Sequence, residues 1–524
     1  MNRLLRRLCA LALLPATLAQ AAPGLVETAV AEGTLVGFTM GDVATFKGVP
    51  FATPPVGTRR WQPPEPAAPW SGKRLATDFS PACVQAAYPE GSMFTSPLRA
   101  TSEDCLYLNV WSADLQPAAP APVMVWIHGG GLTRGTGATG LYDGTRLARK
   151  GVVVVTINYR LGVFGYLAHP ELSEESPQGA SGNYGTLDQI AALRWVQDNI
   201  AAFGGDPSRV TVFGESAGSW SVNHLTATPL AAGLFQRAIG QSGGNFAPMP
   251  ERARAANGLP SAEAAGAQFA TEAGAADLAA LRAMTAAEVL AVAESTRAEL
   301  AAANVDGWVF PKQIAAIFAA GDHNNVDLIV GSNADEGTNL LPPPEDPEAA
   351  WAGLGKLVGA EFMADVRRVY DTGAGVAGPY YGAFRDTIFT WQMREWARLA
   401  RRSNENVYRY YFTFAPAKPL GGRLGAFHAA EIQYVFNNED FLQTLGLGGK
   451  PARRDRALGA AMSDYWVAFA KTGVPAPEGR PQWPRFETES DAYLEFGDTI
   501  EAKTALMPER LDLAGRIIRS KFED

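Results

Sequence analysis

Short runs of apolar residues, separated by glycine-rich turns, make up much of the first half of the chain. Residues 123–127 and 152–157 are almost entirely apolar and rich in valine and isoleucine, which predicts strands buried on both faces. Residues 187–202 next place apolar side chains at near-helical spacing, and residues 210–213 form another apolar run. A strand, a helix and a strand in this order predict a βαβ unit and therefore a mainly parallel sheet.

The second half of the chain is richer in predicted helices. Residues 261–303 contain many alanines with leucine and glutamate, which favours a helical insertion. Residues 326–331 predict one more core strand, and residues 391–400 and 457–471 predict amphipathic helices. No repeat and no linker-like stretch divides the chain, so we expect a single α/β domain over residues 22–524.

The first 21 residues have the layout of a secretory signal peptide. Three arginines precede an apolar stretch at residues 8–14, and the small residues Ala19 and Ala21 predict cleavage after Ala21. This stretch is too short to span a bilayer, and no other run of about 18 apolar residues occurs. We therefore expect an exported protein, periplasmic or secreted, with a signal peptide at residues 1–21 and no stable membrane anchor.

Composition narrows the classes of partner. The 524 residues are 47% hydrophobic and 19% charged, which suits a protein with a large core rather than a disordered chain. The 45 lysines and arginines are outnumbered by 54 aspartates and glutamates, for a net charge of −9 without a basic block. Nucleic acid and anionic membrane surfaces are therefore not expected as partners. The sequence makes no prediction of the oligomeric state.

Three cysteines are present, and Cys9 leaves with the predicted signal peptide. Cys83 and Cys105 remain, and an even pair in an oxidising compartment predicts one disulfide, with two free buried thiols as the alternative. Closing a loop of about 23 residues would stabilise the fold by roughly 3 kcal/mol. Two cysteines without paired histidines nearby do not predict a metal site.

A candidate nucleophile follows the apolar run at residues 210–213. The sequence from Gly214 to Gly218 has the pattern Gly-x-Ser-x-Gly, with Ser216 at its centre, and the segment behind it can form a helix. Strand, tight turn and helix are the context of a nucleophile elbow. Because a serine hydroxyl is a weak nucleophile at neutral pH, it also needs a base and donors for the oxyanion.

Candidate oxyanion donors follow the predicted strand at residues 123–127. His128 and three glycines match the loop whose backbone N–H groups, with that of the residue after the nucleophile, form an oxyanion hole. The expected donors are Gly130, Gly131 and Ala217. The alternative is that the three glycines form only a flexible turn.

Five histidines could supply the base: His128, His169, His224, His323 and His428. In an α/β-hydrolase the histidine comes last in chain order, which selects His428. The acid is expected before it, at the end of a core strand, where Asp335 and Glu336 follow residues 326–331. The pattern alone leaves both acids open.

Several further blocks occur in order along the chain: residues 46–52 (FKGVPFA), 54–57 (PPVG), 102–110 (SEDCLYLNV), 158–162 (NYRLG) and 203–207 (FGGDP). With the serine elbow, these blocks resemble the type-B carboxylesterases, the cholinesterase-like family of the α/β-hydrolase superfamily. The resemblance covers almost the whole chain after residue 21. It implies a large, mostly parallel β-sheet flanked by helices, with helical insertions around the active-site gorge.

The resemblance also implies roles for particular residues. The acid of this family is the glutamate of an Asp-Glu-Gly turn, here Glu336, and the loop around His428 is similar to the family's histidine loop. Ala429 departs from the glycine that many members carry there. The resemblance further implies two structural ion pairs, Arg60 with Glu103 and Arg160 with Asp188, and a secondary serine at Ser221, for which a helix residue bonding locally is the alternative.

Together these observations predict a serine carboxylesterase that hydrolyses carboxylic esters through an acyl-enzyme. Ser216 attacks, His428 is the general acid and base, and Glu336 orients the imidazole, without a metal or an organic cofactor. The absence of tryptophan between Cys83 and Cys105 argues against choline esters as preferred substrates. The alternatives are a catalytically silent cholinesterase-like binding domain, or the same chemistry on amide, carbamate or polyester substrates.

Overall fold

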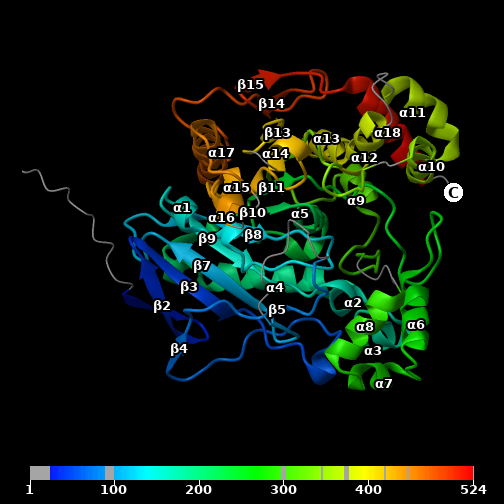
Figure 1. Ribbon diagram of the computed structural model, residues 1–524. Coiled ribbons are helices and arrows are strands. Elements are labelled where there is room, and N and C mark those ends of the chain that lie inside the picture. The colour runs from blue at the N-terminus through cyan, green and yellow to red at the C-terminus, as the bar shows by residue number, and fades with distance from the viewer. Residues whose placement is uncertain are drawn as a thin grey trace, which may run out of the picture.

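The computed structural model describes residues 24–88, 100–296, 302–343, 346–370, 377–417, 420–444 and 448–522 (Figure 1). The signal peptide predicted at residues 1–21 lies outside these ranges. Within them, no helix combines the length and the apolar character that crossing a membrane requires.

One large mixed β-sheet organises the fold. Its strand order is β1-β2-β3-β7-β9-β8-β10-β11-β12-β13-β14-β15, with β4 paired to β2. Along the order β9-β8-β10-β11-β12-β13-β14, each strand is parallel to its neighbour, as the predicted βαβ unit requires. These strands are β9 (Val153–Ile157), β8 (Ala121–Ile127), β10 (Gly205–Glu215), β11 (Arg237–Gln241), β12 (Asp327–Asn333), β13 (Val407–Phe412) and β14 (Tyr493–Phe496).

Both ends of the sheet contain antiparallel strand pairs, and sequence analysis did not predict the strands there. At one end lie β1 (Leu25–Val30), β2 (Gly33–Met40), β3 (Val43–Pro50) and β7 (Tyr107–Ser112); β15 (Ile500–Lys503) lies at the other, and β4 (Lys73–Leu75) flanks β2. In β1 half-buried residues alternate with exposed ones, so the strand lacks the continuous apolar run of the centre. The short strands β5 (Ala82–Cys83) and β6 (Thr101–Ser102) form a separate pair.

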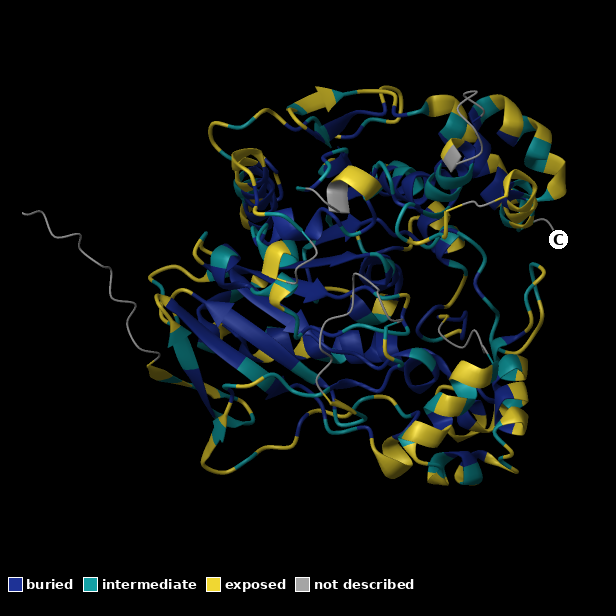
Figure 2. Ribbon diagram, in the orientation of Figure 1, coloured by how far each residue is buried: buried dark blue, intermediate teal, exposed yellow. Residues whose placement is uncertain are grey.

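Helices cover both faces of the central strands (Figures 1 and 2). Along β8, Val123, Val125 and Ile127 join one buried cluster, while Met124 and Trp126 join the other. Because both faces of β8 are buried, apolar residues do not alternate with polar ones along this strand. The first cluster includes α4 (Tyr184–Asn199), α5 (Ala217–Ala227) and α13 (Trp391–Ala400), and the second includes α17 (Arg453–Thr472) and α15 (Ile432–Val435).

The remaining helices lie at the periphery and in the connections. The helical insertion predicted at residues 261–303 consists of α6 (Ala262–Glu272), α7 (Leu278–Ala283) and α8 (Ala286–Thr296). A second group, with α18 (Pro508–Ser520), contains α10 (Pro347–Val358), α11 (Met363–Tyr370) and α12 (Ala377–Arg385), and α12 continues into the π-helical turn Asp386–Thr390 (Figure 1). Shorter helices are α1 (Thr145–Ala148), α2 (Gly162–Tyr166), α3 (Pro170–Glu175), α9 (Ile314–Ala320), α14 (Leu420–Leu424) and α16 (Phe441–Thr444).

Three expected cross-links are present. Cys83 and Cys105 form a disulfide, and both are almost fully buried, which confirms the predicted pair. The guanidinium of Arg60 donates to both carboxylate oxygens of Glu103, at 2.6 Å each. Arg160 does the same to Asp188, at 2.8 and 2.7 Å. Bidentate geometry and burial make these pairs part of the scaffold.

Candidate active site

Ser216 lies in a tight turn between a strand and a helix. β10 ends at Glu215 and α5 begins at Ala217, so Ser216 is the single residue between them, with φ 57° and ψ −124°. A Cβ at Gly214 would lie 2.5 Å from the carbonyl oxygen of Gly218, and one at Gly218 would lie 2.1 Å from that of Ile127. The two glycines of the motif are therefore required by space, as the elbow pattern predicts.

Neighbouring backbone holds this strained turn in place. The Ser216 N–H donates to the carbonyl of Gln241 at the end of β11, at 2.9 Å. A Cβ at Gly243 would lie 2.4 Å from the Ser216 carbonyl oxygen, so backbone passes closely over the turn. A non-glycine residue in such a conformation costs on the order of 1–3 kcal/mol, which the surrounding sheet must offset.

The loop after β8 passes directly beside Ser216. A Cβ at Gly129 would lie 3.0 Å from the Cβ of Ser216. Gly130 has φ +109° and Gly131 has φ +64°, conformations that favour glycine, and the Gly130 carbonyl accepts from the N–H of Arg134 at 3.0 Å. The N–H of Ala217 belongs to the first turn of α5, where backbone donors lack intrahelical partners.

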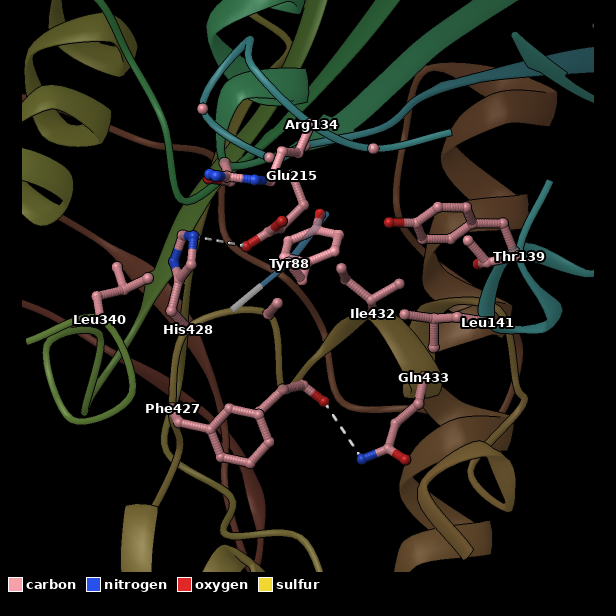
Figure 3. Close-up of a pocket in the computed structure, with 18 of the residues that line it drawn as sticks. Tyr88, Arg134, Thr139, Leu141, Glu215, Leu340, Phe427, His428, Ile432 and Gln433 are labelled. Carbon is pink, nitrogen blue, oxygen red and sulfur yellow. Dashed lines mark hydrogen bonds and ion pairs between the residues drawn. The ribbon is translucent and has the colours of Figure 1, made fainter. Parts of the chain in front are cut away.

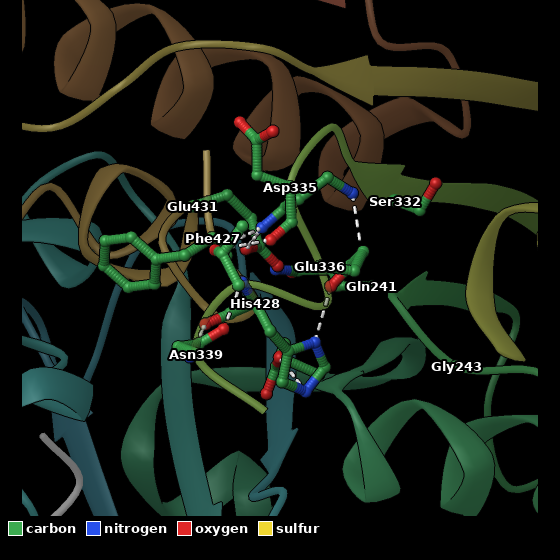
Figure 4. A network of polar contacts seen from close by, with 12 residues as sticks. Gln241, Gly243, Ser332, Asp335, Glu336, Asn339, Phe427, His428 and Glu431 are labelled. Carbon is green, nitrogen blue, oxygen red and sulfur yellow. Dashed lines mark hydrogen bonds and ion pairs between the residues drawn. The ribbon is translucent and has the colours of Figure 1, made fainter. Parts of the chain in front are cut away.

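His428 lies on the loop between α14 and α15, and its Nδ1 donates to Oε2 of Glu336 at 2.6 Å (Figure 4). Glu336 follows β12 and is fully buried. Its other oxygen, Oε1, accepts from the Asn333 N–H at 2.7 Å. One carboxylate oxygen thus fixes Glu336 and the other fixes the imidazole ring.

Asp335 has a different partner from its neighbour. Its Oδ2 accepts from the Ala426 N–H at 2.8 Å, and its own N–H donates to the Ala426 carbonyl at 3.0 Å. A Cβ at Gly425 would lie 2.2 Å from the same carboxylate oxygen, which explains a glycine there. Asp335 therefore ties the loop that carries His428 to the end of β12.

The other four histidines do not line the cavity that Ser216 and His428 share. His128 stacks on Tyr159 with ring centroids 4.5 Å apart, and burial lowers the pKa of His128 to about 4. His169 accepts from the N–H of Glu171 at the start of α3. The remaining two, His224 and His323, bond to the side chains of Asn245 and Ser403, respectively. All four have local structural partners.

Ser216 and His428 line one cavity of about 500 Å³ (Figure 3). This volume suits a small-molecule ligand. Among the described lining residues, Glu215 is the one carboxylate and Arg134 the one arginine or lysine. Most of the wall is apolar: Leu141, Tyr142, Trp220, Leu340, Phe384, Ile388, Phe389, Phe427, Ile432, Phe441 and Leu442.

Sequence comparison identifies the family. The model of the Carboxylesterase family matches residues 23–352 and 371–514. The chain belongs to this family. It is 41% identical over 478 residues to the fumonisin B1 esterase of Sphingopyxis macrogoltabida. This match covers 88% of this chain and 84% of that protein. It is 36% identical over 485 residues to the para-nitrobenzyl esterase of Bacillus subtilis (strain 168), covering 90% and 94% of the two chains.

Solved structures agree with this assignment. A PNB esterase superimposes with a TM-score of 0.82 at 32% identity, over 93% of this chain and 99% of the other. A thermophilic PNB esterase does so with the same TM-score at 33% identity and the same coverage. The predicted resemblance and the α/β-hydrolase fold are thereby confirmed, and this carboxylesterase is a carboxylic ester hydrolase.

The carboxylesterase has one close contact that sequence analysis did not predict. Nε2 of His428 lies 3.1 Å from Oε1 of Glu215, the residue immediately before Ser216 (Figure 3). Burial alone would lower the pKa of His428, but the negative charges of Glu215 and Glu336 outweigh it and raise this pKa to about 9.

A third buried carboxylate, Glu431, completes the polar network in Figure 4. Its Oε1 accepts from Gln241 at 3.0 Å and its Oε2 from Asn333 at 2.6 Å. Burial raises the pKa of Glu431. Glu431 was not predicted as a site residue. Its position three residues after His428 was the one sequence feature that pointed to it. Because its partners lie on β11 and β12, only the fold brings them together.

Ser221 lies one turn into α5 and does not line the cavity of this carboxylesterase. Its hydroxyl donates to the Ala217 carbonyl at 3.0 Å and accepts from Gln189 at 2.8 Å. The bond to Ala217 is the local bonding that the sequence left as the alternative, and the bond to Gln189 on α4 adds a contact from a remote segment.

Proposed function

We propose that this carboxylesterase hydrolyses esters through an acyl-enzyme on Ser216, with His428 as general base and acid and Glu336 as the orienting acid. The observation that carries this proposal is the 2.6 Å bond from His428 Nδ1 to Glu336, beside a nucleophile elbow in the same cavity. A carboxylate on Nδ1 fixes the tautomer in which Nε2 can take a proton, and stabilises the imidazolium that forms.

The proposed reaction has two halves. The Ser216 oxygen bonds to the ester carbonyl carbon while His428 takes the hydroxyl proton, and the backbone N–H groups of Gly130, Gly131 and Ala217 stabilise the oxyanion. Collapse of this intermediate breaks the bond to the alcohol, which receives the proton from His428. Water then attacks the acyl-enzyme by the same proton transfers in reverse, releasing the acid and the free serine.

The apolar wall of the cavity supports esters with a sizeable apolar part as substrates. Two relatives are named for esterase activity on fumonisin B1 and para-nitrobenzyl compounds. Amides, carbamates and polyesters would use the same atoms, and a chain-length and leaving-group series separates them from simple esters.

The proposal includes export. A signal peptide at residues 1–21 would leave a single domain of residues 22–524, and the buried disulfide between Cys83 and Cys105 supports an oxidising compartment. Mass spectrometry of the protein produced with its own leader should find Ala22 as the first residue. A mass that includes Met1 would overturn the export proposal.

The central test is hydrolysis of p-nitrophenyl esters from acetate to palmitate by wild type and Ser216→Ala. We expect activity in wild type, a loss of several orders of magnitude in the variant, and one phosphoryl adduct on wild type after an organophosphate probe. Equal rates in the two proteins would overturn the proposal. A folded wild type with neither activity nor adduct would favour the catalytically silent binding domain.

A further inference from the structure

Arg134 is the one arginine or lysine among the described residues that line the Ser216 cavity, and it has few partners of its own. Its Nε donates to the carbonyl of Ala87 at 3.3 Å. Its guanidinium carbon lies 5.9 Å from the centroid of the Tyr88 ring. Among the described residues, no carboxylate forms an ion pair with Arg134, and none provides a hydrogen-bond acceptor to its two Nη groups.

Backbone contacts fix Arg134 to the proposed oxyanion loop. The Arg134 N–H donates to the Gly130 carbonyl, and a Cβ at Gly130 would lie only 2.2 Å from the Arg134 carbonyl oxygen. The same Cβ would lie 3.3 Å from the Tyr88 hydroxyl, so Tyr88 borders the loop that contains Gly130 and Arg134. Figure 3 includes Arg134, Tyr88, Glu215 and His428 around the same cavity.

The positive charge of the Arg134 guanidinium is unusual in a cavity with a mostly apolar wall. The wall of the cavity is mostly apolar, and the whole chain has a net charge of −9, which on its own disfavours an anionic ligand. A neutral ester needs no cation there. An arginine held by Nε and by an aromatic face is pre-organised to offer its Nη groups to a carboxylate in a bidentate manner.

We propose that Arg134 forms an anion subsite, so that this carboxylesterase favours esters that carry an additional free carboxylate. This inference rests on the proposed ester hydrolysis at Ser216 and adds a substrate class to it. The carboxylate belongs either to the acid half, as in a monoester of a dicarboxylic acid, or to the alcohol half of the ester. Low local polarity strengthens the pairing relative to one at the open surface.

Three esters of similar size test the subsite. The neutral reference is 4-nitrobenzyl hexanoate. In 4-nitrobenzyl hydrogen adipate the carboxylate is on the acid half, and in 4-carboxybenzyl hexanoate it is on the alcohol half. The readout is the ratio of kcat/KM for each charged ester to that for the neutral ester, because this ratio cancels any effect common to all three.

We expect wild type to favour one charged ester over the neutral one, which identifies the half that Arg134 recognises. Arg134→Gln should lower that ratio by about tenfold to a hundredfold, through KM more than kcat. Arg134→Lys should retain part of the preference, since lysine keeps the positive charge but lacks the paired N–H donors of the guanidinium. Arg254→Gln removes a cation whose side chain is 72% exposed, outside the cavity, and should leave the ratio unchanged.

Two results would overturn the subsite: no preference of wild type for either charged ester, or an equal loss on all three esters in Arg134→Gln, which indicates a structural role. If Arg134→Gln does not fold, the salt dependence of wild type tests the subsite instead. Raising the NaCl concentration screens the charges and must reduce the ratio of kcat/KM for the charged ester to that for the neutral ester. A ratio that is independent of salt then overturns the subsite. If wild type hydrolyses none of the esters, the proposed function itself fails.

Discussion

The imidazole of His428 lies between two carboxylates, with Nδ1 2.6 Å from Glu336 and Nε2 3.1 Å from Glu215. All three side chains are almost completely buried. Under these conditions the negative charge favours the protonated ring, which explains the pKa of about 9 for His428. The residue next to the proposed nucleophile thereby influences the protonation of the proposed base.

This relationship predicts a pH effect of Glu215→Gln. A general base must be neutral to accept a proton, so activity should fall as the pH decreases below the pKa of His428, about 9. Removing the charge of Glu215 lowers that pKa and should move the acidic limb of kcat/KM to lower pH by about one to two units. A pH–rate profile of wild type and variant measures the shift. An acidic limb at the same pH in both proteins would contradict the coupling.

The two neighbouring acids are distinguished by a pair of isosteric variants. Glu336→Gln removes the carboxylate that bonds Nδ1 and should lower kcat by about a thousandfold to ten-thousandfold with little change in thermal unfolding. Asp335→Asn weakens a bond to the Ala426 N–H and should reduce the free energy of unfolding by about 1 kcal/mol, with less than a tenfold loss of kcat. A larger loss of kcat in Asp335→Asn would mean that Asp335 is the acid.

Ala429, directly after His428, has φ 74°, a left-handed conformation that a Cβ disfavours by about 1–2 kcal/mol. Ala429→Gly relieves this strain, and the gain should exceed the entropy cost of glycine. We expect the free energy of unfolding to rise by about 0.5–1 kcal/mol. Ala430→Gly is the matched control, because Ala430 lacks a positive φ and should lose stability. The strain argument is wrong if both variants are destabilised equally.

The disulfide between Cys83 and Cys105 should contribute to stability through loop closure. The two sulfurs join residues 22 positions apart, so replacing both cysteines by serine should lower the free energy of unfolding by about 3 kcal/mol. Thermal unfolding of the double variant and of wild type measures this effect. Wild type reduced in denaturant and refolded under reducing conditions is the control, and it should resemble the variant. An unchanged unfolding temperature would refute the contribution.

Sequence patterns predicted β8, β9, β12 and part of β10, because these central strands are buried on both faces and their apolar runs are almost unbroken. Two further central strands, β11 and β13, were missed because they carry polar residues whose partners are remote. Arg409 in β13 pairs with Asp491, and Gln241 at the end of β11 bonds Glu431 and Trp466. A buried polar side chain is acceptable only with such a partner, and no local pattern contains it.

The sequence by itself determined the elbow around Ser216 and the three-glycine loop, because each is a short segment whose chemistry depends on its immediate neighbours. Blocks along the chain indicated the family, and chain order selected His428. The local pattern left Asp335 and Glu336 open and the family resemblance implied Glu336; the tertiary structure shows the reason, since the two adjacent side chains meet different partners and Glu336 bonds His428. It also brought Glu215 to the same ring and Arg134 to the same cavity. These contacts join segments far apart in the chain, so packing of the sheet and its loops sets them.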